Sequence, residues 1–137
     1  MKTPVRTLTV LAVSCLATIA VGADDKKTPT IKEVMSKLHK GAKSPLAKLK
    51  TALKAESPDW KSIQDSTKDF VILGAALAKN DPPKGEKHAY KKLADSYFEQ
   101  SKAMDDAAKK EDKAAANAAF TKVSTSCMAC HKAHKPS

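Results

Sequence analysis

The chain has 137 residues, enough for one small domain, and a formal net charge of +10 from 25 basic against 15 acidic side chains. Its basic character comes from lysine, because Arg6 is the only arginine, and its aromatic residues are one Trp, two Tyr and three Phe. Specific base contacts depend strongly on arginine and single-strand binding needs exposed aromatic rings, so this composition argues against a nucleic-acid-binding protein.

The first residues have the features of an export signal. Two basic residues precede an apolar run over 8–21, and small residues close the segment at Ala23. The run is short for a bilayer span of roughly 20 residues, which disfavours an uncleaved anchor. A lipoprotein modified at Cys15 is a weaker alternative. We predict a signal peptide of residues 1–23 and a soluble mature domain of residues 24–137 with a net charge of +8, located in the periplasm or otherwise exported.

The first helix of the mature chain is marked by a capping box. Thr30 serves as the N-cap and Glu33 follows three residues later. Apolar residues then recur at helical spacing up to Gly41, and Met35 is one of them. The segment 45–55 repeats leucine at the same spacing, so the helix either continues through it or restarts at Pro45.

Three further helices follow. We expect the second to begin with Ser57 as N-cap and Pro58 at the first helical position. After the breaker "NDPPKGEK", a third helix runs over about 87–109 and buries both tyrosines. A fourth, rich in alanine, runs from the turn near "KKEDK" toward the C-terminus. Four amphipathic helices joined by short connections predict an all-α fold, an antiparallel four-helix bundle.

The predicted helices bury many alanines, which contribute little apolar area for each residue in a domain of this size. A core made of such small side chains leaves space for a rigid, largely apolar group. This composition supports a bound cofactor in the bundle.

The segment "CMACH" near the C-terminus carries the strongest motif. On a helix, Cys127, Cys130 and His131 project from one side, so two thiols can join one edge of a haem while the imidazole reaches iron. A redox dithiol would instead need a βαβ context. A zinc site would need four ligands, here Cys127, Cys130, His131 and His134, which lie much closer together in the sequence than zinc-finger ligands usually do. We therefore predict one covalently bound haem c for each chain, which agrees with export.

The stretch "AAFTKVSTSCMACHKAH" resembles the last helix of the class II c-type cytochromes, the cytochrome c′ family of four-helix bundles. The resemblance covers about residues 30–135 and is specific over the final twenty or so. The family commonly has an arginine shortly after the haem-binding histidine, where this chain has His134 and Lys135. We expect His134 to be a solvated neighbour of the haem edge.

The resemblance implies that a residue of the first helix faces the iron opposite His131. Members with methionine there resemble electron carriers, whereas members with an apolar or aromatic residue bind gases such as nitric oxide. Here Met35 is the expected distal ligand and His39, four residues later, is the rival. We expect one-electron transfer and no enzymatic activity; the alternatives are a five-coordinate protein that binds nitric oxide and, more remotely, a small peroxidase.

Lysines surround the motif in the sequence and on the first helix. We expect these lysines to form a positive rim around the haem edge. This rim would speed the encounter with an acidic redox partner protein, which could belong to a membrane redox chain. Some family members dimerise through their first two helices, so a homodimer is an open alternative. The residues expected to form this rim are Lys37, Lys40, Lys122, Lys132 and Lys135.

Overall fold

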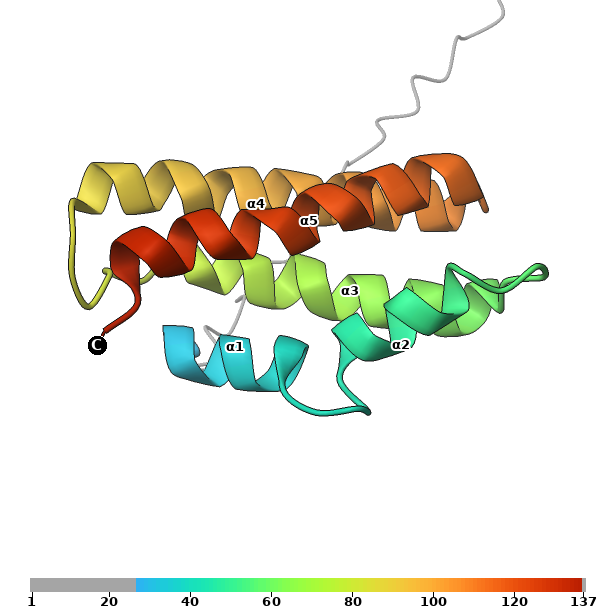
Figure 1. Ribbon diagram of the computed structural model, residues 1–137, viewed down its shortest axis with the longest axis horizontal. Coiled ribbons are helices and arrows are strands. Elements are labelled where there is room, and N and C mark those ends of the chain that lie inside the picture. Colours follow the sequence, from blue (N-terminus) through green and yellow to red (C-terminus); the bar gives the residue numbers. More distant parts are fainter. Residues whose placement is uncertain (1–26, 137) are drawn as a thin grey trace, which may run out of the picture.

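The computed structural model describes residues 27–136, so the predicted signal peptide, residues 1–23, lies outside the described residues. All regular secondary structure within 27–136 is helical, without a strand, which confirms the all-α prediction (Figure 1). The helices are α1 (Ile31–His39), α2 (Pro45–Ala52), α3 (Trp60–Leu77), α4 (Lys87–Lys109) and α5 (Lys113–His134).

The start of α1 is the predicted capping box. The Thr30 hydroxyl accepts the Glu33 N–H at 3.3 Å, and the Glu33 carboxylate accepts the Thr30 N–H at 2.7 Å. The chain leaves α1 through Gly41, whose φ of 92° lies in the left-handed region, and restarts as α2 at Pro45. The two segments are therefore separate helices rather than one continuous helix.

The start of α3 differs from the prediction. Asp59, and not Ser57, is the N-cap, and its carboxylate accepts the Ser62 N–H at 3.2 Å. The helix therefore begins at Trp60, and Pro58 precedes the cap instead of occupying the first helical position. The carboxylate of Asp59 satisfies a first-turn N–H that would otherwise lack a partner, which explains why the cap falls there.

A tight turn joins α4 to α5. The Asp112 N–H donates to the Ala107 carbonyl at 2.9 Å and the Glu111 N–H to the Ala108 carbonyl at 3.1 Å, the hydrogen-bond pair of a Schellman motif. Glu111 takes the left-handed position with φ 56°, and Asp112 then caps α5 by accepting the Ala115 N–H at 2.9 Å. Local hydrogen bonds thus define the turn.

The three long helices pack in chain order, with α4 against both α3 and α5, while α1 and α2 pack on α3 (Figure 1). A buried hydrogen bond from the Thr67 hydroxyl to Asp105 at 2.7 Å ties α3 to α4.

No helix of residues 27–136 has the length and apolar character needed to cross a membrane. The largest fully buried apolar side chains are Val34, Leu38, Leu49, Leu53, Ile63, Phe70, Met104 and Val123.

Candidate functional site

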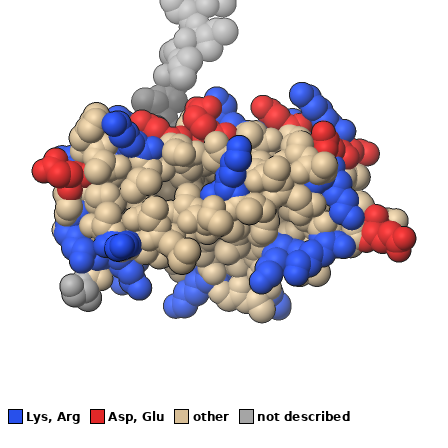
Figure 2. All heavy atoms as spheres, turned by 45° about the horizontal axis from the view of Figure 1, so that its top comes forward, with Lys and Arg blue, Asp and Glu red and all other residues tan. Residues whose placement is uncertain are grey.

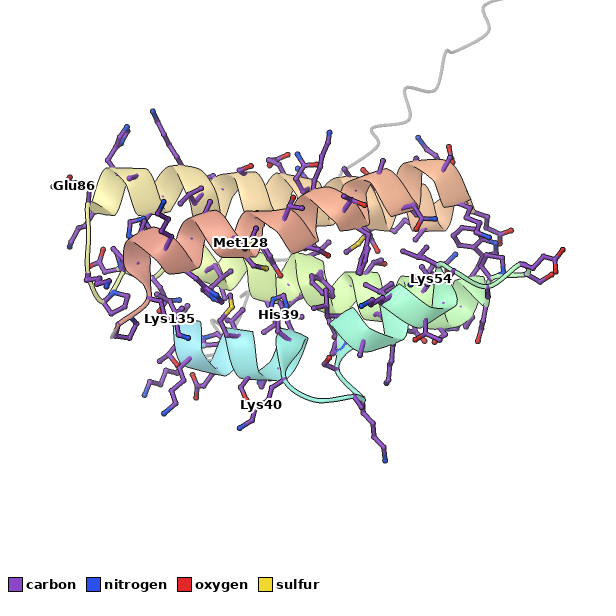
Figure 3. All side chains as sticks on the ribbon, viewed as in Figure 1. His39, Lys40, Lys54, Glu86, Met128 and Lys135 are labelled. Atoms are coloured by element: carbon purple, nitrogen blue, oxygen red, sulfur yellow. The ribbon has the colours of Figure 1, made fainter. Side chains whose placement is uncertain are left out.

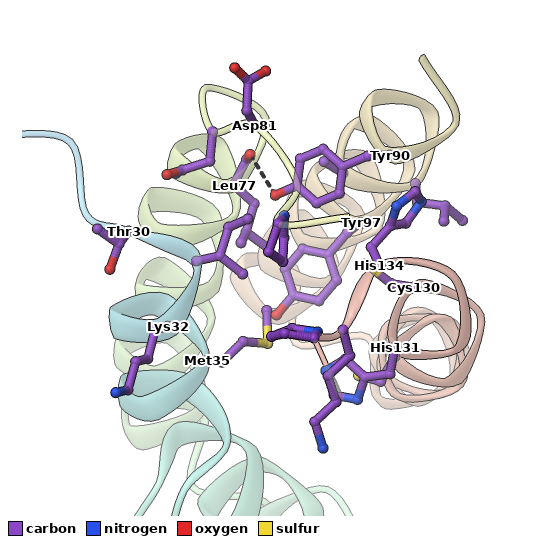
Figure 4. A pocket seen from close by; sticks show the side chains of 18 of the residues that line it. Thr30, Lys32, Met35, Leu77, Asp81, Tyr90, Tyr97, Cys130, His131 and His134 are labelled. Carbon is purple, nitrogen blue, oxygen red and sulfur yellow. Dashed lines mark hydrogen bonds between the residues drawn. The ribbon is translucent and has the colours of Figure 1, made fainter. Parts of the chain in front are cut away.

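A cavity of about 640 Å³ lies between α1 and the C-terminal part of α5 (Figure 4). The N-terminal half of α4, the end of α3 and the segment after α3 complete its walls. Met35 lines it from α1, and Cys127, Cys130 and His131 line it from α5. The fold thus brings all four predicted site residues to one cavity, although they come from opposite ends of the described chain.

The lining of the cavity is mostly apolar. Ile31, Leu77 and Leu93 contribute aliphatic surface, and Tyr90 and Tyr97 contribute aromatic faces. Charged side chains among the lining residues, including Lys32, Asp81 and Lys135, are exposed. Apolar walls and a volume within roughly 300–1,000 Å³ are typical of cofactor and small-molecule sites.

The two cysteines stand one helical turn apart and are half-buried free thiols. Burial raises the pKa of both thiols, and a negative charge on Cys127 would raise the pKa of Cys130 further. Both groups are therefore protonated at neutral pH, whereas a reactive dithiol relies on a lowered pKa. This environment favours packing against an apolar group over thiolate redox chemistry.

His131 and Met35 approach the cavity from different helices. His131 is exposed at the edge of α5, while Met35 is half-buried on the inner side of α1. In Figure 4 the two side chains extend into the space between these helices. An imidazole and a thioether are thus available to one group bound in the cavity.

His134 was predicted to be solvated, and this is wrong. Its side chain is only 3% exposed, because the ring packs edge-on against Tyr90 with centroids 5.4 Å apart. A carbonyl can only accept, so Nδ1 donates to the Lys84 carbonyl at 3.0 Å. The other nitrogen, Nε2, is buried and has no hydrogen-bond partner among residues 27–136, and His134 lines the cavity. An unpaired buried polar atom is costly, so this nitrogen suits an occupant with a complementary polar group.

A zinc site would require Cys127, Cys130, His131 and His134 to converge. The ring of His134 is instead fixed by Tyr90 and the Lys84 carbonyl. Within the part of the chain that the structure describes, no group of three or more His, Cys, Asp or Glu residues is arranged to hold a metal ion.

His39, the rival ligand on α1, is half-buried but does not line the cavity. Its Nε2 lies 3.2 Å from the Tyr97 hydroxyl, and its ring meets Phe70 edge-on. Burial lowers the pKa of His39, and a positive charge on His131 lowers it further. The remaining histidine, His88, is exposed at the start of α4.

The two tyrosines belong to the site, although the sequence indicated only that they are buried. Burial raises the pKa of Tyr90 to about 12, and a negative charge on Cys130 would add to this effect. The pKa of Tyr97 is raised more strongly, again mainly by burial. Both hydroxyls therefore stay protonated, and that of Tyr90 donates to the Leu77 carbonyl at 3.0 Å (Figure 4).

Sequence reasoning also missed the segment after α3 as part of the cavity wall. The Asn80 amide fixes this segment by donating to the Pro29 carbonyl at 2.9 Å and to the Ala76 carbonyl at 2.7 Å. Only the spacing of His134, one turn beyond Cys130, could have indicated a further side chain on the cavity side of α5.

Comparisons of this chain with protein-family models, with curated proteins and with solved structures found no match.

Proposed function

We propose that residues 24–137 form an exported, monohaem c-type cytochrome that transfers one electron at a time. Cys127 and Cys130 would hold the haem covalently, His131 would be the proximal ligand and Met35 the distal ligand. The observation that carries this proposal is the convergence of these four side chains on one largely apolar cavity. When bound, the haem would supply the ferrous–ferric couple.

The residues present fit such a group. The cavity offers about 640 Å³ between apolar walls, protonated thiols in its α5 wall and the unpaired Nε2 of His134 for a polar contact. A thioether from Met35 would raise the reduction potential relative to a second histidine. The apolar walls would limit the access of water and thereby tune the potential further.

We further propose that α1 and α2 act as one interrupted helix, so that the fold is an antiparallel four-helix bundle of the class II cytochrome type. Two features support this arrangement. A break of only residues 40–44 separates α1 from α2, and both helices pack on α3. The other three helices are long, follow one another through short connections and pack in chain order.

The surface charge supports an acidic redox partner. All five lysines of the expected rim are exposed, and Lys135 also lines the cavity. Between Lys113 and His134, α5 carries no carboxylate. Figure 2 shows a face with a broad uncharged centre and lysine side chains along its lower edge. A positive rim beside the cavity would attract an acidic protein, and this attraction would weaken as salt rises.

Denaturing electrophoresis of the exported protein, followed by a haem stain, tests the central claim. The wild-type chain should keep its stain, and Cys127→Ala combined with Cys130→Ala should lose it. The matched control is Met128→Ala, within the same motif, because Met128 is 76% exposed and should not affect attachment. Haem that extracts freely from the wild type into acidified organic solvent would overturn the proposal.

A further inference from the structure

Two side chains on α1 could serve as the distal ligand. Met35 and His39 stand four residues apart, so they project from the same side of the helix. Only Met35 lines the cavity. Imidazole is a common ligand of haem iron, so the chain needs a physical reason why His39 does not compete.

The reason lies in what surrounds the ring of His39. Its Nε2 lies 3.2 Å from the Tyr97 hydroxyl of α4. The ring also meets Phe70 of α3 edge-on, with centroids 5.8 Å apart and an interplanar angle of 86°. Figure 3 shows His39 between α1 and the longer helices, while the neighbouring Lys40 points outward. Phe70 and Tyr97 are 0% and 5% exposed, so the ring is held from two directions by core residues.

The hydrogen bond to Tyr97 removes Nε2 from ligation in either tautomer of His39. If the Tyr97 hydroxyl donates, it occupies the lone pair that iron would need. If Nε2 carries the proton and donates, this nitrogen has no lone pair, and the lone pair left on Nδ1 belongs to a ring that does not line the cavity. Release of His39 would also leave the buried Tyr97 hydroxyl without a partner, since no other partner is found within the described residues.

We propose that Tyr97 is a positioning residue that selects Met35 over His39 as the distal ligand by holding the His39 Nε2 in a hydrogen bond. The inference rests on the proposed function and adds the rule by which this site distinguishes two ligands. Tyr97 lies in the wall of the same cavity, so the selection operates beside the position where the ligand must bind.

The test substitutes Tyr97→Phe, which removes only the hydroxyl. In the ferric holoprotein, the absorption band from thioether-to-iron charge transfer should be lost and the reduction potential should fall, because His39 replaces Met35. The double variant Tyr97→Phe with His39→Ala should recover both the band and the potential, since no competing imidazole is left on α1. Circular dichroism establishes that each variant keeps its helices.

An unchanged band and potential in Tyr97→Phe would overturn the inference. Failure of the double variant to recover them would also overturn it, because Tyr97 would then act by packing alone. If Tyr97→Phe does not fold, nitrogen NMR of the ferrous wild type decides: a free, hydrogen-bonded His39 Nε2 supports the inference, and an iron-bound one refutes it. Failure of the proposed function itself is read separately, from loss of the haem stain in the wild type.

Discussion

Gly85 lies directly against the imidazole of His134, so that a Cβ atom at position 85 would stand 2.8 Å from Nδ1. The same atom would stand 2.9 Å from the Ala133 carbonyl oxygen. This close approach lets the Lys84 carbonyl accept its hydrogen bond from His134 and holds the segment before α4 against the end of α5. The glycine is needed both for this contact and for its φ of 81°.

The variant Gly85→Ala should therefore lose more stability than Gly41→Ala. Both substitutions place a side chain at positive φ, at a cost of roughly 1 kcal/mol. At Gly41 a Cβ would meet no atom of the described residues within 4 Å, whereas at Gly85 His134 or the backbone must move, for about 1–3 kcal/mol more. Urea unfolding measures the difference, and equal losses would show that the contact with His134 adds nothing.

Under the proposed function, the distal ligand would decide between an electron carrier and a gas-binding protein. If Met35 binds the iron, the ferrous wild type should take up carbon monoxide slowly, and Met35→Ala should take it up faster by at least an order of magnitude. The reduction potential of this variant should also fall. Stopped-flow mixing and redox titration give both quantities.

The control for this experiment is His39→Ala, which should leave carbon monoxide uptake nearly unchanged. A large effect of His39→Ala together with none of Met35→Ala would assign the ligand to His39. If neither substitution matters, the distal position is open and the protein is a gas binder.

If the cavity binds haem as proposed, protein produced without it should be less stable and less helical than the protein that contains it, because a group that binds only the folded state stabilises that state. We expect its melting temperature to be lower by roughly 10 °C or more, which corresponds to about 2 kcal/mol in a domain of this size. Thermal melts followed by circular dichroism compare the two forms. Equal melting temperatures would mean that the helices pack adequately around the cavity without an occupant.

His39 should make stability depend on pH. Burial lowers its pKa in the folded state, so the unfolded chain binds more protons as pH falls below its ordinary value of about 6.5. This contribution to stability is fully present above about pH 6.5 and is lost as pH falls through the lower folded pKa. Urea unfolding at pH 5 and pH 7.5 should show a smaller difference for His39→Gln than for the wild type.

The matched control is His88→Gln, which makes the same substitution at a histidine that is exposed at the start of α4. An undiminished pH dependence in His39→Gln would mean that His39 does not account for it.

Local patterns in the sequence predicted the parts of the fold that depend on neighbouring residues. The capping box of Thr30 and Glu33 is confirmed, and the restart at Pro45 is one of the two alternatives considered. The start of α3 was predicted two residues early, because Ser57 and Asp59 are both good caps and Pro58 favoured the first. Local chemistry alone could not decide between two competing caps.

The relationships within the site depend on contacts between distant segments. His134 was expected to be a solvated neighbour of the haem edge, but the segment around Gly85 packs against it. The partner of His39 comes from α4, and no pattern within α1 indicates Tyr97. That Cys127, Cys130 and His131 lie on one side of one helix could be predicted, because this depends only on their spacing along α5.

The cavity lies between two segments that are far apart in the sequence. One wall comes from α1, near one end of the described residues, and another comes from α5, near the other end. A group bonded to both Met35 and His131 would close a loop that contains most of the domain. The entropy lost by closing such a loop grows only with the logarithm of its length, so a long loop is not much harder to close than a short one. A single coordinate bond at Met35 would act as a reversible crosslink between α1 and α5. Its breakage would release α1 first, because the turn of the α4–α5 hairpin is held by its own hydrogen bonds. Amide exchange in α1 would then report the state of that one bond.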